Sequence, residues 1–206
     1  MKKICLFLTS MALVMSSFTA NAQLGNSEKL FDAAEVSLSP VTLNINAMGI
    51  TLKYNFTAVN ASWYQARTIT PDLPVFLQYG AGLQYTMGNM DFMDEDAPTN
   101  LLTVKVPVNV VYDFAVPNTE LSVLPYAGLN LQGHILGSSD GYSLFDEDEM
   151  GMAFNRISLG WQIGAKVAYD KYFFGIGYEG PVTSLFKEDG MTVKLSQVNI
   201  SVGMKF

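Results

Sequence analysis

The sequence contains little cysteine, little histidine and no long hydrophobic run beyond its first residues. Its one cysteine is Cys5 and its one histidine is His134. Because Cys5 lies in a segment that we expect to be removed, the mature chain is predicted to have no disulfide, no catalytic thiol and no cysteine-ligated metal. From residue 23 onward no apolar stretch approaches the ~18 residues of a candidate transmembrane helix. A disulfide-stabilised fold and a helical membrane protein are both excluded.

Positive charge is also scarce. The whole chain carries 12 Lys and Arg against 19 Asp and Glu, a formal net charge of −7. Removal of Lys2 and Lys3 with the first segment takes this charge to −9. Nucleic acid is not an expected partner, because phosphate backbones are bound by clustered Lys and Arg.

Residues 1–22 are predicted to form a cleaved secretory signal peptide. Lys2 and Lys3 make a basic head, residues 4–14 make an apolar run, and Ala20-Asn21-Ala22 has the A-x-A pattern of a cleavage site. The alternative is a transmembrane anchor, but a helix needs about 20 apolar residues to cross a bilayer. We therefore expect an exported protein with one domain, residues 23–206.

Apolar and polar residues alternate through the remaining chain. In the clearest segment, residues 156–170, the large apolar side chains share one parity from Ile157 to Tyr169, and the other parity holds Gln162, Lys166 and small residues. Successive strand residues point to opposite faces of a sheet, so this pattern predicts a strand with one apolar face. The same pattern predicts strands over residues 50–56, 77–85, 102–113, 123–132, 172–179 and 197–206.

The first predicted strand, residues 35–46, is irregular. Its parity slips between Leu38 and Val41, which suggests a β-bulge at Pro40. With this segment the chain has eight strands, a number that suits a closed outer-membrane barrel.

Closure is expected because lipid offers no hydrogen bonds to the backbone groups of an open sheet edge. A soluble lipocalin-like barrel is the alternative, with its apolar face turned inward around a ligand. Two features favour the membrane barrel: the polar faces are rich in glycine, and aromatic residues gather at the strand ends, as in interfacial girdles. The predicted fold is an all-β, eight-stranded antiparallel up-and-down transmembrane barrel, located in the outer membrane.

The predicted connections alternate in length. Residues 116–119 and 170–171 are short turns, whereas residues 87–100, 135–155 and 180–193 are long. With both termini in the periplasm, this matches the short periplasmic turns and longer outer loops of such barrels. The connection over residues 61–73 is an exception, because it is long for a periplasmic turn.

Two of the outer loops are acidic and contain no Lys or Arg. A solvated, like-charged loop accounts for this composition. The alternative is binding of a divalent cation, since carboxylate oxygens suit calcium, although the spacing matches no EF-hand. No metal or cofactor is assigned. The acidic residues are Asp91, Asp94, Glu95 and Asp96 in one loop and Asp146, Glu147, Asp148 and Glu149 in the next.

Short segments along the chain point to a family: Leu73–Leu77, Val106–Tyr112, Pro125–Asn130, Ser143–Asp146, Met150-Gly151 and Arg156–Ile163. They resemble the outer-membrane β-barrel (porin-like, OmpA-transmembrane-like) family of the Bacteroidota type. The resemblance covers nearly all of residues 23–206, and its motifs are architectural rather than catalytic. It implies assembly by the outer-membrane insertion machinery, which would read the last strand and Phe206. Periplasmic chaperones, outer-membrane lipids and lipopolysaccharide are the other expected partners.

Several charged residues fall on the predicted inward parity. Buried charges must be paired and hydrogen-bonded, so we expect a network across the lumen. Eight strands leave an interior that side chains fill, which favours a non-enzymatic barrel with a structural or surface-interaction role. A narrow pore, or a ligand- or cation-binding barrel, is the alternative. The network residues are Lys53, Lys105, Asp113, Arg156, Lys166, Glu179 and Lys205.

His134 is the one candidate centre for an enzyme. Some barrels of this size are lipid hydrolases with a Ser-His-acid set, and Ser138, Ser139 and Glu179 could complete one here. A single histidine without a serine motif is insufficient to assign catalysis, so no catalytic residue is named. An outer-leaflet lipid-modifying enzyme remains the lesser alternative.

Overall fold

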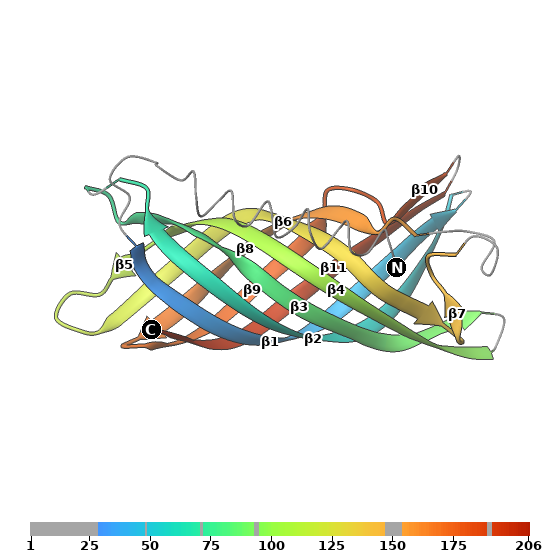
Figure 1. Cartoon of the computed structure of the whole chain (residues 1–206), viewed down its shortest axis with the longest axis horizontal. Helices are drawn as coiled ribbons and strands as arrows, with labels where there is room; N and C mark the ends of the chain where they lie inside the picture. The colour runs from blue at the N-terminus through green and yellow to red at the C-terminus, as the bar shows by residue number, and fades with distance from the viewer. Residues whose placement is uncertain (1–28, 48, 71, 93–94, 147–153, 189–190) are drawn as a thin grey trace.

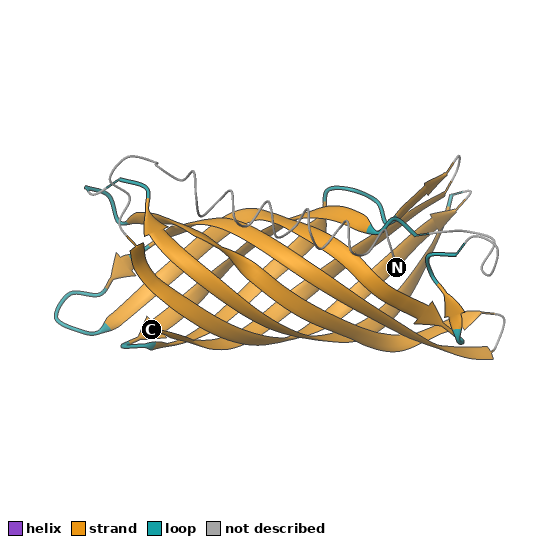
Figure 2. Cartoon of the chain, viewed as in Figure 1, coloured by secondary structure: helices purple, strands orange, loops and turns teal. Residues whose placement is uncertain are grey.

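The computed structural model describes residues 29–206, apart from 48, 71, 93–94, 147–153 and 189–190. The predicted signal peptide lies outside the described residues. Eight long strands pair around one ring, and nearly all of the described chain is strand. Figures 1 and 2 show these strands wrapped around one axis. The long strands are β1 (Lys29–Ala47), β2 (Ile50–Thr68), β3 (Val75–Phe92), β4 (Glu95–Tyr112), β6 (Leu121–Ser139), β8 (Ile157–Tyr169), β9 (Tyr172–Pro181) and β11 (Met191–Lys205).

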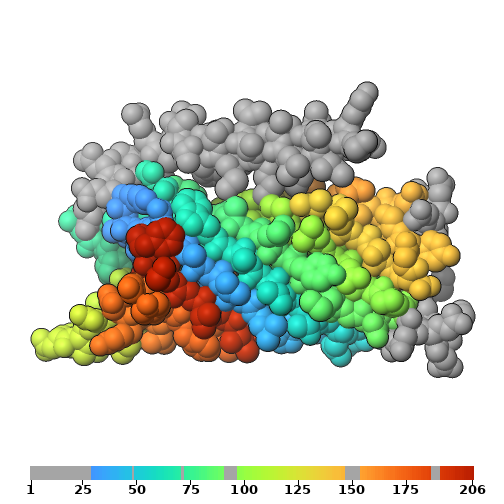
Figure 3. Space-filling view, turned by 60° about the horizontal axis from the view of Figure 1, so that its bottom comes forward, coloured from blue at the N-terminus to red at the C-terminus, as the bar shows by residue number. Residues whose placement is uncertain are grey.

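Each long strand pairs antiparallel with the next, and β1 pairs with β11. That last pairing closes the barrel. It runs from Ala33 opposite Lys205 to Ala47 opposite Met191. Figure 3 shows this seam, where β11 in red lies directly against β1 in blue. The short strands β5 (Phe114–Ala115), β7 (Tyr142–Ser143) and β10 (Phe186–Glu188) add to the ends of the ring.

No helix in the described residues is long and apolar enough to span a membrane.

The alternation predicted for β8 is confirmed by burial. Ile157, Ile163 and Val167 are exposed on the outer surface, whereas Gln162 and Lys166 are buried inside. Along β4 and β9 the inward residues are likewise buried and the outward ones more exposed, although Val111 and Phe173 turn inward at the inner end. An apolar outer face and a polar inner face are what a strand needs when lipid lies on one side and a narrow lumen on the other.

The β-bulge predicted at Pro40 is wrong. The register of β1 against β11 is continuous from Leu38 opposite Ile200 to Val41 opposite Gln197, and it is also continuous against β2. Val41 is buried on the same face as Ser39. The inward residues change from polar to apolar along β1, and the strand does not change face. The one register shift beside β4 lies in β6, where Ile135 is the extra residue next to His134.

Two predicted connections are also shorter than expected. β2 continues to Thr68, so the long connection predicted over residues 61–73 is mostly strand. β3 and β4 continue to Phe92 and Glu95, so the outer loop predicted over residues 87–100 is mostly a β-hairpin. These stretches were missed because their outward positions carry few large apolar residues, for example Ala61 and Asn89.

Two apolar clusters fill the ends of the lumen. The inner cluster lies at the end that holds the C-terminus and consists of Ala33, Tyr64, Ala66, Phe76, Val111, Leu124, Ala168 and Phe173. The outer cluster lies at the opposite end and consists of Val41, Leu43, Ile45, Phe56, Ala58, Met90, Leu144, Leu185 and Val193. Between them the inward side chains are polar or charged, and this middle section is the candidate site.

Candidate functional site: the polar lumen

Two buried ion pairs cross the lumen between the apolar clusters. Lys105 on β4 pairs with Glu179 on β9, with 2.5 Å between Nζ and Oε2. Lys166 on β8 pairs with Glu35 on β1. All four side chains are buried. Burial of two opposite charges is costly unless the pair is close and its remaining polar atoms are bonded, and both conditions are met for the Lys105–Glu179 pair.

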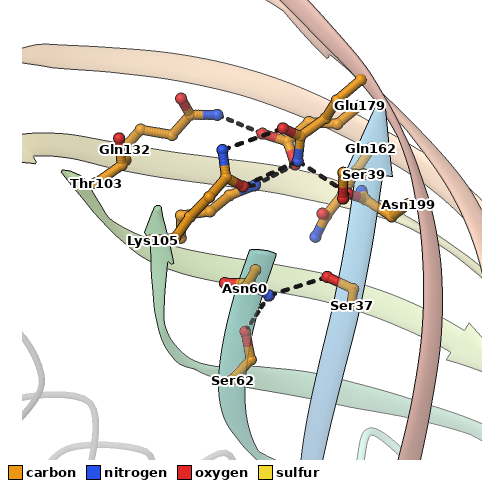
Figure 4. A network of polar contacts seen from close by, with 12 residues as sticks. Ser37, Ser39, Asn60, Ser62, Thr103, Lys105, Gln132, Gln162, Glu179 and Asn199 are labelled. Carbon is orange, nitrogen blue, oxygen red and sulfur yellow. Dashed lines mark hydrogen bonds and ion pairs between the residues drawn. The ribbon is translucent and has the colours of Figure 1, made fainter. Parts of the chain in front are cut away.

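Glu179 is the centre of the hydrogen-bond network (Figure 4). Besides the ammonium group of Lys105, it accepts a hydrogen bond from Gln197 Nε2 at 3.1 Å and another from Gln132. Lys105 Nζ also donates to Gln84 Oε1 at 3.1 Å. Donors from β4, β6 and β11 therefore meet on a carboxylate from β9, and the contacts tie one side of the barrel to the other.

The network continues toward β1. Gln197 Nε2 donates to Asn199 Oδ1 at 2.9 Å, and Ser39 Oγ donates to the same oxygen at 2.6 Å. Nearby, Asn60 Nδ2 donates to Ser62 Oγ at 2.9 Å. Figure 4 shows these side chains pointing toward one another within the ring of strands.

Lys166 lies where the polar section meets the inner cluster. Its Nζ is 4.8 Å from the ring centroid of Tyr64, 4.9 Å from that of Phe173 and 5.4 Å from that of Tyr126. Three aromatic faces and the carboxylate of Glu35 surround the ammonium group. Such cation–π contacts are worth about 2 kcal/mol when desolvated, so they offset part of the cost of burying this charge.

Crowding around Tyr126 explains a glycine that faces it. A Cβ at Gly177 would lie 2.1 Å from the Tyr126 hydroxyl oxygen. Gly175, Gly177 and Gly180 form a G-x-G-x-x-G pattern within β9, where the central glycine makes room for a ring from β6.

A small polar cavity of about 30 Å³ lies between the two ion pairs. Lys105, Glu179, Lys166 and Glu35 line it together with Asn130, whose Oδ1 has no hydrogen-bond partner among the described residues. A site of this size suits one or two water molecules rather than an organic ligand.

His134 is buried in the same network. Its Nδ1 lies 2.9 Å from Thr103 Oγ1, and its Nε2 lies 3.0 Å from Ser158 Oγ. The predicted serine partners are not brought to the ring: Ser139 Oγ lies 2.8 Å from Thr99 Oγ1 instead. Glu179 reaches the histidine only through Gln132 and Ser158. The Ser-His-acid set considered from the sequence is not assembled in this geometry.

The structure brings Lys105, Lys166 and Glu179 into the lumen but places the other predicted network residues elsewhere. Lys53 is exposed on the outer surface of β2, so its assignment to the lumen is wrong. The cause is the outer cluster: Tyr54 and Phe56 turn inward to it, and Lys53 must face outward.

The remaining three lie at the rims. Arg156 is exposed just before β8, where Nη1 donates to the Ile135 carbonyl at 3.2 Å and the guanidinium stacks 4.4 Å from the Phe145 ring centroid. Lys205 is half-buried over Phe31 at the inner end. Asp113 is half-buried just beyond β4. Arg156 is therefore wrongly assigned to the lumen, because the strand that was predicted to carry it begins one residue later.

The acidic loops are only partly described. Asp91 on β3 lies opposite Asp96 on β4, and Glu95 opens β4. Asp146 is exposed after β7. Within the described ranges, no three His, Cys, Asp or Glu residues are grouped so that they could hold a metal ion. The other acidic positions, Asp94, Glu147, Asp148 and Glu149, lie outside the described residues.

Sequence reasoning missed Glu35 as the partner of Lys166. A usable signal was present, because Glu35 alternates with Val36 and Leu38, which are both more than half exposed on the outer surface. The parity slip farther along the segment obscured this pattern.

No protein-family model matches this chain, and none of the curated proteins matches it. Among solved structures, the outer membrane enzyme PagL is 11% identical, with 82% of this chain and 98% of that chain covered and a TM-score of 0.49. The attachment invasion locus protein Ail of Yersinia pestis, in complex with the heparin analogue sucrose octasulfate, is 14% identical, with coverage of 86% and 100% and a TM-score of 0.43. Neisserial surface protein A is 14% identical, with coverage of 84% and 99% and a TM-score of 0.41.

At such low identity these likenesses concern the fold alone. The fold is an eight-stranded antiparallel β-barrel of the outer-membrane type. This rests on the closed ring of strands and on the barrel's apolar outer surface. The Bacteroidota family suggested by the sequence stays a prediction.

Proposed function

We propose that this protein is a non-enzymatic integral protein of the outer membrane whose filled lumen makes it a rigid structural unit. Its surface-interaction role is carried by the outer end. The observation that carries the proposal is the interlocked lumen: the two ion pairs and the amides bonded to Glu179 link side chains from opposite sides of the barrel.

The outer surface supports placement in a membrane. Phe174, Ile176 and Val202 are each more than half exposed and lie side by side on β9 and β11. A continuous apolar surface of this kind is unfavourable in water and favourable in lipid. Aromatic residues lie near its borders: the rings of Trp161 and Tyr178 are 5.3 Å apart toward one end of the strands, and those of Tyr112 and Phe114 are 4.2 Å apart at the other.

Transport through the lumen is disfavoured by its contents. A solute would have to displace the outer cluster, break the Lys105–Glu179 pair and then pass the aromatic rings around Lys166. A passing solute offers no carboxylate or ammonium group to replace the lost ion-pair partner, so breaking the pair leaves a buried charge uncompensated. A narrow pore is therefore the weaker alternative.

The lipid-modifying enzyme is the competing hypothesis, because barrels of this fold include an enzyme. Against it, the His134 ring is buried in the lumen, away from the lipid-facing surface, and both of its nitrogens have hydroxyl partners. A histidine that must take a proton from a nucleophile at the lipid surface needs access to that surface.

The test is to incubate the refolded protein with outer-leaflet glycolipid and to follow the glycolipid by mass spectrometry. We expect an unchanged mass for the wild type and for His134→Ala alike. Loss of an acyl chain with the wild type, absent with His134→Ala, would replace this proposal by the enzyme. We also propose that the chain binds periplasmic chaperones and that the insertion machinery recognises β11 and Phe206. These interactions need separate tests in cells.

A further inference from the structure

On β11, β1 and β2 the outward residues change from apolar to polar along the strands, toward the outer end of the barrel. Register partners on these strands form transverse rows, because the pairings of β1 with both neighbours are continuous. One row contains Ile200, Leu38 and Val59, whose side chains are all exposed to between 43% and 54%. This row belongs to the apolar surface that we place in lipid.

Toward the outer end the outward positions on the same three strands become wholly polar. We define the polar wall as the nine outward residues of these rows: Thr192, Lys194 and Ser196 on β11, Thr42, Asn44 and Asn46 on β1, and Thr51, Lys53 and Asn55 on β2. Hydrogen bonds between neighbours hold these side chains on one face: Thr51 Oγ1 donates to Asn46 Oδ1 at 3.0 Å, and Thr42 Oγ1 donates to Asn55 Oδ1 at 3.5 Å.

The polar wall is basic in a chain that is otherwise acidic. Asn44 pairs with Lys194 on one side and with Lys53 on the other, and both lysines are exposed. The wall contains no Asp or Glu, although the chain as a whole carries a net charge of −7. Two strand spacings separate the lysine Cα atoms by about 10 Å, so their flexible stems can converge on one anion above the Asn44 amide.

The lysine row lies just above the headgroup layer. The row of Val198, Pro40 and Thr57 lies between the polar wall and the apolar rows, and the lysine row is four residues farther along each strand. Four residues span about 14 Å along a strand, or roughly 10 Å in height at the tilt usual for barrels. The polar layer of a bilayer is about 5–8 Å thick on each side, and lysine stems can reach back into it.

We propose that the polar wall is a docking site for the anionic phosphate groups of an outer-leaflet lipid, held by Lys53, Lys194 and the Asn44 amide between them. This proposal rests on the placement of the barrel in a membrane argued above. The widest sequence gaps between long strands separate β6 from β8 and β9 from β11. The strand ends beside these gaps lie at the end where the polar wall is found, which makes it the outer end. Charge complementarity decides the occupant, since a cationic wall at this height meets lipid phosphates before any other anion.

The experiment uses a local tryptophan reporter in vesicles. Thr57 is exposed in the row directly inside the polar wall, so Thr57→Trp in a Trp63→Phe, Trp161→Phe background senses the lipids beside it. The full mature chain is refolded into phosphatidylcholine vesicles that contain a minor fraction of dibrominated phosphatidic acid, whose bromines quench tryptophan. A parallel sample contains dibrominated phosphatidylcholine.

We expect phosphatidic acid to be enriched beside the reporter about fivefold for each lysine, the preference typical of basic residues at an anionic surface. Lys53→Gln with Lys194→Gln should abolish the enrichment, and arginine at both positions should retain it. The matched control is Lys29→Gln with Lys171→Gln, which removes two exposed charges at the opposite end and should leave the enrichment unchanged.

Equal quenching by the two lipids, or enrichment that survives loss of both polar-wall lysines, would overturn the inference while leaving the membrane placement intact. Absence of quenching by phosphatidylcholine itself would mean that the reporter does not face lipid, and the proposed function would fail first.

Discussion

The ion pair between Lys105 and Glu179 offers the sharpest quantitative prediction. Lys105→Met removes the ammonium group and leaves the carboxylate of Glu179, which is 3% exposed, with only the amide donors of Gln132 and Gln197. Leaving one member of a buried pair uncompensated typically costs about 3–5 kcal/mol. We expect Lys105→Met and Glu179→Leu each to lower the free energy of unfolding by that amount.

The double variant completes a double-mutant cycle and is its decisive member. Lys105→Met with Glu179→Leu removes both charges. The side-chain amides of Gln84 and Gln197 still bond each other, and Gln132 Oε1 still accepts from Ser158, while Gln132 Nε2 loses its bond to Glu179. Its cost should fall to roughly 1–2 kcal/mol, that of the neutral hydrogen bonds lost. The double variant should therefore be more stable than either single variant.

Urea unfolding in lipid vesicles, followed by tryptophan fluorescence and heat-modifiable gel mobility, measures these differences. With a slope of about 2 kcal/mol per molar urea, a loss of 4 kcal/mol shifts the midpoint by about 2 M. Lys171→Met, at an exposed turn, is the control and should change stability by less than about 0.5 kcal/mol. Single variants that cost under 1 kcal/mol, or a double variant that costs the sum of the two, would refute the reasoning.

Three further predictions follow from the placement of individual side chains. Trp63 and Trp161 are 42% and 40% exposed on the outer surface, so brominated lipids should quench both, and loss of quenching in either single-tryptophan variant would contradict the lipid-facing surface. A water-soluble amine reagent should modify Lys53 and Lys171 in the folded barrel but spare Lys105 and Lys166, as read by mass spectrometry; early modification of Lys105 would mean an open lumen. Phe56→Ala in the outer cluster should cost about 3–5 kcal/mol, whereas truncating Phe174 on the lipid-facing surface should cost clearly less, and equal costs would argue against a packed outer cluster.

Much of the fold was predictable because most strands separate the same two environments along their length. In β8 lipid lies outside and a polar lumen inside, so a single parity rule assigns every large apolar residue, and in β9 Phe173 is the exception because it turns inward to the inner cluster. The eight strands and their order follow from that rule together with the connection lengths.

The outer ends of β1, β2 and β11 did not obey the rule, for a physical reason. There the outside becomes polar and the inside becomes the outer cluster, so the apolar parity reverses while the strand continues. Val41 and Val193 are buried on the parity that holds Ser39 and Gln197 farther down their strands. The reversal looked like a bulge in β1, and it put Lys53 on the wrong face.

The pairing of charges in the candidate site could not be predicted from the sequence. Lys105, Lys166 and Glu179 were correctly placed inside, because parity is a local property. Which charges pair is set by register around the closed ring: Glu35 and Lys166 meet across 131 positions of chain. No local pattern carries that information, nor the cage of Tyr64, Tyr126 and Phe173 around Lys166.

Single-channel recording in planar bilayers tests the claim of a filled lumen most directly. The barrel is predicted to insert without discrete conductance steps, since the two apolar clusters and the two ion pairs fill the lumen and the cavity between the ion pairs is about 30 Å³. Reproducible steps from the wild-type barrel, altered in size by Lys105→Met or Lys166→Met, would contradict the account and establish a pore.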